Sequence, residues 1–255
     1  MLRKSIYLSI AVLSITALLI PTANTQTGKP IMSTTATVSN LDLTHGTATI
    51  EILNQSNKDI TAYAVAYEGV LQDHHVIQGG ERLMDYGSLL AAKHQTLRPG
   101  EISTQPVQFF PKPNNPLTAV RATVVAVVFA DQTSEASSPD ALDRIVAART
   151  EMVLMGRISV GALEKALADT NPHPGALAGK TIRDRIAQTP NLGASASGPG
   201  ISKEFMQHVA QEFEDAPNRA AATGITEREH LTQRLADLRQ RLQEDEAYSQ
   251  IRRQP

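Results

Sequence analysis

The chain has 255 residues, of which 41% are hydrophobic and 4% aromatic, with a formal net charge of −2 and no cysteine or tryptophan. A near-neutral charge without a basic cluster argues against a nucleic-acid-binding protein. The absence of cysteine excludes disulfides and thiol catalysis, so an ordinary apolar core has to stabilise the fold.

The N-terminus has the pattern of a secretory signal, because the basic MLRK is followed by an uncharged apolar run that ends at Pro21. As a helix this run would rise about 24 Å, against the roughly 30 Å of a bilayer core. We therefore expect residues 1–23 to be a signal peptide and the protein to be periplasmic or secreted. Because the residues before Asn24 match a cleavage site poorly, an uncleaved anchor in the inner membrane is the alternative.

The composition changes near Ser138, from a part rich in Val, Thr and Ile to a part rich in Ala, Leu, Arg and Glu. This change predicts an α+β protein. We expect a β domain over 31–136, a helical segment over 138–189, a flexible linker rich in Gly and Ser over 190–200, and further helices over 201–255.

Alternating apolar and polar residues predict strands in the first part, with turns between them. The run from 118 to 131 is apolar on both faces and should be a central strand. Region 71–94 is weaker and is expected to hold a hairpin or a lid-like excursion. Roughly six or seven strands in about 100 residues indicate an antiparallel two-sheet sandwich. The expected strands are 36–43, 47–53, 59–70, 103–110 and 118–131.

The order of LNQSNKDITAYAVAY, a charged excursion, LRPGE and VVAVVFAD resembles secreted bacterial modules with an immunoglobulin-like or FxLYD-like sandwich. The resemblance covers about 100 residues and rests on turns and alternation. The Phe-x-Leu-Tyr-Asp run of that family is absent from this chain. The resemblance implies an immunoglobulin-like fold and a role as an envelope or binding module.

A helix start is predicted at Ser138-Pro139-Asp140, where Ser138 is the cap, Pro139 the first helical residue and Asp140 an acid in the first turn. Apolar residues at helical spacing follow. Arg149 interrupts the apolar stripe, and Gly156 predicts a bend. Shorter helices are expected over 176–188 and 202–215. The last helix should begin at the capping box Thr226 to Glu229 and run to about Arg253.

The last helix carries a narrow leucine seam with spacings of four, three and four residues. The seam is shorter than two heptads, so it cannot form a long coiled coil. It either packs on the chain's own helices, for example in an antiparallel hairpin with 202–215, or binds a protein partner or a second copy. Its residues are Leu231, Leu235, Leu238 and Leu242.

Asp73-His74-His75 is the densest group of potential metal ligands, and His94 is the nearest candidate for a further ligand. An exposed polar loop is the other interpretation of this group. The chain has no G-x-S-x-G elbow, and EREH lacks the second histidine of a metalloprotease helix. We therefore expect a noncatalytic exported protein without a cofactor, with a binding or structural role in the bacterial envelope. The alternative is a metal-binding protein or enzyme centred on Asp73, His74 and His75.

Overall fold

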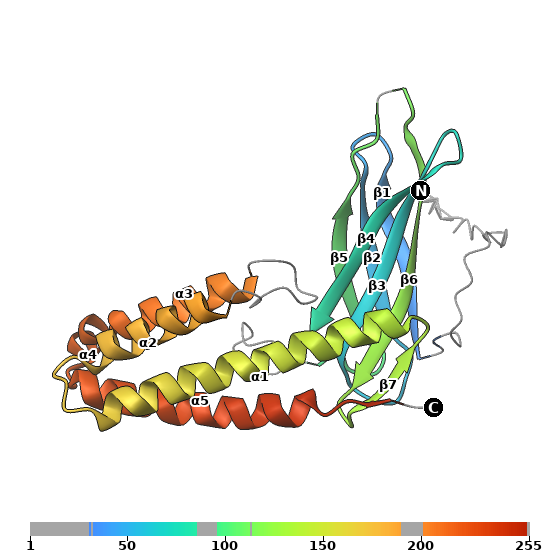
Figure 1. Ribbon diagram of the computed structural model, residues 1–255. Coiled ribbons are helices and arrows are strands. Elements are labelled where there is room, and N and C mark those ends of the chain that lie inside the picture. The colour runs from blue at the N-terminus through green and yellow to red at the C-terminus, as the bar shows by residue number, and fades with distance from the viewer. Residues whose placement is uncertain (1–30, 32, 86–95, 113, 190–200, 254–255) are drawn as a thin grey trace, which may run out of the picture.

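The computed structural model describes residues 31, 33–85, 96–112, 114–189 and 201–253 (Figure 1). Strands come first and helices follow, which confirms the α+β class. The strands are β1 (Thr34–Asp42), β2 (Thr47–Asn54), β3 (Ile60–Leu71), β4 (Val76–Asp85), β5 (Ile102–Gln108), β6 (Leu117–Phe129), β7 (Thr133–Ala136) and β8 (Arg252–Arg253). The helices are α1 (Pro139–Ala168), α2 (Pro174–Gln188), α3 (Ile201–Glu214), α4 (Ala216–Thr223) and α5 (Glu227–Ser249).

The strands form a three-stranded sheet in the order β1-β2-β5 and a five-stranded sheet in the order β4-β3-β6-β7-β8. Neighbouring strands are antiparallel, except that β7 and β8 are parallel. β6 lies between β3 and β7, so the prediction of a central strand over 118–131 is confirmed. The weak region after residue 71 forms a hairpin, since β4 pairs with β3.

Strand β3 is buried on both faces, which explains its apolar and alanine-rich alternation. Tyr63 and Val65 lie in a core that also contains Ile50 and Ile52 of the smaller sheet. Alternate residues of the same strand, among them Ala62, lie in a second core with residues of helix α1. The small alanine side chains let the helix approach the sheet closely.

Asn54 organises the NQSNK loop that precedes β3. Its side chain is fully buried, and its Nδ2 donates to the carbonyl oxygens of Lys58 and Leu97, both at 2.8 Å. Its Oδ1 accepts from the backbone N–H of Ser56 at 3.0 Å. These bonds satisfy a buried amide that would otherwise destabilise the fold.

Two of the predicted helix starts are confirmed in detail. The Ser138 hydroxyl accepts from the backbone N–H of Ala141 at 3.3 Å. In the capping box, the Glu229 N–H donates to Thr226 Oγ1 at 3.2 Å, and the Thr226 N–H donates to Glu229 Oε2 at 2.8 Å. Both caps are local interactions, which is why the sequence reveals them.

Gly156, where we predicted a bend, does not interrupt α1, which is helical over 30 residues. A Cβ atom on Gly156 would lie 3.1 Å from Leu242 Cδ1 of α5. The missing side chain of Gly156 therefore allows α1 and α5 to pack closely at this point.

The helices form an arm that projects from the sheets (Figure 1). Helices α1 and α5 lie side by side and antiparallel, and they are joined by the ion pairs Arg157–Glu246 at 2.8 Å and Arg239–Glu164 at 2.7 Å. Both long helices share one core with α2, α3 and α4. The hairpin of the last helix with 202–215 is thus not the main pairing, because α5 packs chiefly along α1. We call residues 139–249 the helical arm.

Arg149 joins the helical arm to the sheets. Its side chain is only 2% exposed, and its guanidinium binds Asp85 of β4, with Nε 2.8 Å from Oδ2. It also donates to the Tyr248 carbonyl oxygen at 2.8 Å and to Thr61 Oγ1 at 3.0 Å. One buried charge therefore connects α1, two strands and the end of α5.

The chain end returns to the larger sheet, where the sequence predicted helix to about Arg253. Helix α5 ends at Ser249, and β8 pairs with β7. The Arg252 N–H donates to the Gln132 carbonyl oxygen at 2.7 Å, and Ser134 Oγ donates to the Arg252 carbonyl oxygen at 3.1 Å. This pairing attaches α5 to the sheet in addition to Arg149.

Residues 1–23 and 190–200, for which we predicted a signal or anchor and a linker, lie outside the described residues. Within the described part of the chain, no helix is both long and apolar enough to cross a membrane.

The turn between β6 and β7 contains an acid whose charge is stabilised by its neighbours. Asp131 Oδ2 lies 2.7 Å from Lys58 Nζ, and Asp131 Oδ1 accepts from the backbone N–H of Thr133 at 3.0 Å. The hydrogen bonds from Lys58 and Thr133 lower the pKa of Asp131 to about 2.

Replacing Arg149 with methionine should lower the free energy of unfolding by about 3–5 kcal/mol, because the Asp85 carboxylate would stay buried without its guanidinium partner. Arg157→Met is the matched control, since Arg157 lies on the same helix and also pairs with α5, but its side chain is 63% exposed. This control should cost about 1 kcal/mol or less. Urea unfolding followed by circular dichroism measures both values, and equal losses in the two variants would contradict the assignment.

Acid should remove the stabilisation that Asp131 provides. Because the pKa of Asp131 is lowered to about 2 in the folded chain, its contribution is present above the unfolded pKa near 3.8 and is lost as the pH falls toward 2. The side chain is 47% exposed, so we expect about 1 kcal/mol or less. In unfolding experiments at pH 5 and pH 2, Asp131→Asn should reduce the difference between the two stabilities. An unreduced difference would show that other groups account for the acid sensitivity.

Candidate functional site

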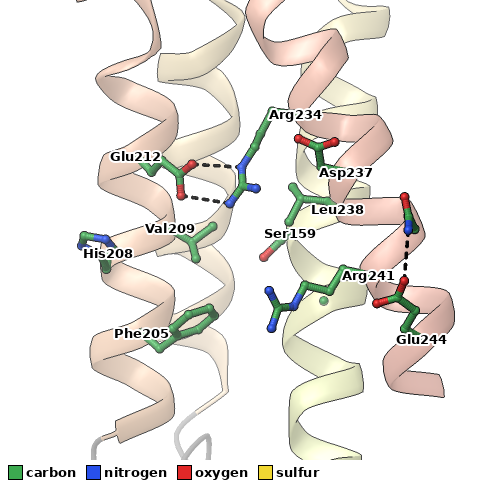
Figure 2. Close-up of a pocket in the computed structure, with 12 residues that line it drawn as sticks. Ser159, Phe205, His208, Val209, Glu212, Arg234, Asp237, Leu238, Arg241 and Glu244 are labelled. Carbon is green, nitrogen blue, oxygen red and sulfur yellow. Dashed lines mark hydrogen bonds and ion pairs between the residues drawn. The ribbon is translucent and has the colours of Figure 1, made fainter. Parts of the chain in front are cut away.

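A groove on the helical arm, between α3 and α5 with α1 at its base, is the best candidate for a functional site (Figure 2). Its volume is about 430 Å³. The groove is lined by Gly156, Ser159, Phe205, His208, Val209, Glu212, Arg234, Asp237, Leu238, Gln240, Arg241 and Glu244.

An ion pair crosses the groove between α3 and α5, as Figure 2 shows. Arg234 Nε lies 2.9 Å from Glu212 Oε1, and Arg234 Nη2 donates to Glu212 Oε2 at 3.2 Å. Arg219 of α4 lies 3.8 Å from the same carboxylate. The ion pair, with one hydrogen bond, links α3 and α5 at this point.

The other walls combine apolar and charged groups. Phe205 and Val209 of α3 face Leu238 across the groove, while Asp237 and Arg241 project from α5 (Figure 2). Such a mixture can accept apolar side chains at the centre and charged side chains of either sign at the rim. The groove therefore suits a polypeptide segment better than a small apolar molecule.

Ser159 at the base of the groove has no arrangement for nucleophilic catalysis. Its hydroxyl donates to the Met155 carbonyl oxygen at 2.9 Å, and its other described contact is the Met206 sulfur at 3.9 Å. Neither atom can act as a general base. Figure 2 shows the His208 ring pointing away from the centre of the groove.

The leucine seam of the last helix lies inside the helical arm. Leu231 and Leu235 are 1% and 8% exposed, and they belong to the core shared by the five helices. Leu238 and Leu242 are half-buried against the same core. Of the two alternatives for the seam, packing on the chain's own helices is the one that the structure contains. Leu238 is the member of the seam that also lines the groove.

Asp73, His74 and His75 form the turn between β3 and β4, at the end of the sheets away from the helical arm (Figure 1). Asp73 Oδ1 accepts from the His75 N–H at 3.0 Å, and Asp73 Oδ2 accepts from Asn115 Nδ2 at 2.6 Å. The His75 N–H first, and then Asn115, hold the pKa of Asp73 below its ordinary value. The carboxylate thus stabilises a turn that contains His74 at φ +65°.

His94, the expected further ligand, lies outside the described residues. Among the residues whose positions are described, no three or more His, Cys, Asp or Glu side chains are grouped so that they could hold a metal ion. Of the residues in the metal hypothesis whose positions are described, Asp73 Oδ2 and His75 Nδ1 are 3.0 Å apart.

The sequence did not predict the groove. Its charged residues come from separate helices, and each looks like part of a solvated helix face when read alone. The hairpin suggested for the last helix with 202–215 would place α3 beside α5, but the leucine spacing did not indicate which charged residues would meet there, such as Glu212 and Arg234.

Searches against family models, curated proteins and solved structures find no match to this chain.

Purified protein should bind zinc well below one ion per chain, because Asp73 is already engaged by its own turn. The measurement is metal analysis after incubation with zinc and desalting, with His75→Ala as the comparison. We expect the two proteins to retain the same small amount of zinc. One zinc per chain that disappears in His75→Ala would instead support the metal-binding alternative.

Proposed function

We propose that this chain is a noncatalytic exported protein of the bacterial envelope, in which an immunoglobulin-like sandwich carries a rigid helical arm with a binding or structural role. The observation that carries the proposal is that both long helices of the arm, α1 and α5, are attached to the sheets. Arg149 holds the start of α1, and the pairing of β8 with β7 holds the end of α5.

The core shared by the two antiparallel sheets supports the sandwich part of the proposal. Ile50 and Ile52 of the smaller sheet share a core with Tyr63, Val65 and Val127 of the larger one. Two sheets that bury their inner faces against each other over about 100 residues are typical of immunoglobulin-like domains.

The double attachment supports a rigid arm. A single connection would let the helices swing about one loop. Two attachments, the buried Arg149–Asp85 ion pair and the pairing of β8 with β7, resist such movement. Helix α1 also buries Leu142 and Ile145 against the outer face of the larger sheet. An arm held in this way can present a surface at a constant distance and orientation from the sheets.

The groove supports a binding role for the arm. It is open at its rim, since Asp237 and Gln240 are exposed, and it contains no described nucleophile and base in contact. We infer that a protein partner uses this groove, and therefore the charged residues of α5 together with Leu238, the one seam leucine that lines it. The N-terminal pattern over residues 1–23 supports export.

Export and binding can be tested in one experiment, with a photoreactive amino acid placed at Asp237 in the groove. Thr232 is the matched control position, because it is exposed on the same helix and does not line the groove. We expect the full chain in the periplasmic or membrane fraction of a Gram-negative host, and more crosslinked product from position 237 than from position 232 after illumination.

A version without residues 1–23 should stay in the cytoplasm and serves as the fractionation control. Retention of the full chain in the cytoplasm would contradict export. Equal crosslinking from both positions would contradict the groove as the binding surface.

A further inference from the structure

The outermost strands of the two sheets differ in how well they are protected against pairing with another chain. An outermost strand presents unpaired N–H and C=O groups, and proteins usually block such edges with proline, charges, bulges or a covering segment. In the described part of the chain the outermost strands are β1 and β5 in the smaller sheet, and β4 and β8 in the larger sheet.

β5 is blocked by Pro106. The Phe109 N–H donates to the Gly46 carbonyl oxygen, and the Asn54 N–H donates to the Glu101 carbonyl oxygen. Residues 101 and 109 therefore face β2, and by alternation so do the other odd-numbered residues of β5. Even-numbered residues then face the free side, and at position 106 a proline removes the donor there.

The larger sheet is blocked at both sides. β4 has a register shift against β3 between Tyr67 and Glu68, and it carries the charged pair Glu81-Arg82. Glu81 is also tied to Arg144 of α1. At the other side, β8 covers β7. These are the usual devices that prevent strand addition.

β1 lacks these devices from Thr34 to Ser39, because its one register shift against β2 lies further along, between Ser39 and Asp42. It is nine residues long, contains no proline, carries no charge before Asp42, and among the described residues pairs with β2 alone. Gln55 donates to the Ser33 carbonyl oxygen, so alternation directs the peptide groups of Ala36 and Val38 toward the free side. Leu41 and Leu43, at and just beyond the end of this strand, are 41% and 39% exposed.

We propose that the free side of β1 pairs with β1 of a second copy of this chain, antiparallel about a two-fold axis at Thr37. In this register Ala36 lies opposite Val38 of the partner subunit, so the free peptide groups of both strands meet. On the outer face Thr37 meets its own copy, and Thr35 lies opposite Ser39 of the partner subunit. The two smaller sheets become one continuous six-stranded sheet, since each contributes three strands.

A second copy fits this edge because the strand is complementary to itself. Like charges directly opposite each other destabilise paired strands, and β1 has no charged residue from Thr34 to Leu41. Thr–Thr and Thr–Ser pairs across two strands are favourable. On the outer face of this sheet the acid nearest to Thr37 is Glu51, one strand further in, where it accepts a hydrogen bond from Ser39. A two-fold axis is also the commonest symmetry of homo-oligomers.

This inference is independent of export and of the groove on the helical arm. It differs from the self-association through the C-terminal helix that the sequence suggested, because it uses a strand edge of the smaller sheet.

The absence of cysteine from the chain allows a direct test by single cysteines in the purified full chain. Thr37→Cys should form a disulfide-linked dimer under mild oxidation, because residues on the two-fold axis lie within disulfide distance in this register. Thr104→Cys is the matched control, an exposed threonine on the outer face of the same sheet but on β5, the strand blocked by Pro106. We expect at least about tenfold more dimer from Thr37→Cys than from the control on non-reducing gels.

A second substitution separates strand pairing from chance collision. Ala36→Pro, added to Thr37→Cys, removes an N–H on the free side of β1 and keeps the bonds to β2, so dimer formation should fall to the control level. Circular dichroism confirms that this double variant is folded. Equal dimer formation from Thr37→Cys and Thr104→Cys, or dimer formation that Ala36→Pro leaves unchanged, would overturn the proposal.

Discussion

The buried ion pair between Arg149 and Asp85 is the interaction on which the arrangement of sheets and helices depends. Moving an arginine out of water is costly, and the cost is offset only when its donors find partners in good geometry. Here the partners are a carboxylate on β4, a hydroxyl on β3 and a carbonyl oxygen at the end of α5. A shift of any one element would leave a buried charge without its partner. The pair therefore favours one placement of the helical arm over all others.

What the sequence could predict is what local interactions determine. The period of two in β1, β2 and β3, the apolar run of β6 and the capping box of α5 all depend on residues within one element or one turn, and each is observed. β7 and β8 were missed because strands of four and two residues are too short to show a period. α4 was missed because the predicted helix ended at residue 215, and no element was assigned between it and the capping box at Thr226.

The interactions that were misread are those between distant segments. Arg149 looked like an interruption of an apolar stripe, since its partner Asp85 lies 64 residues earlier in the chain. Gly156 looked like a helix breaker, but its role depends on Leu242 of another helix. The leucine seam was recognised from its spacing, yet spacing alone could not decide between the chain's own helices and a partner. The groove was missed for the same reason, because it exists only where three helices meet.

The two sheets differ in how far other parts of the chain cover them, and this difference limits where a second chain could pair. Helix α1 packs on the outer face of the larger sheet, and β8 covers one of its edges, so this sheet has little free backbone to offer. The smaller sheet keeps an outer face rich in threonine and one unblocked edge. Pairing of two chains through β1 would join the smaller sheets, while the helical arms pack on the larger ones. The proposed self-association and the proposed binding in the groove would thus use separate parts of the molecule, and a dimer would present two grooves at once.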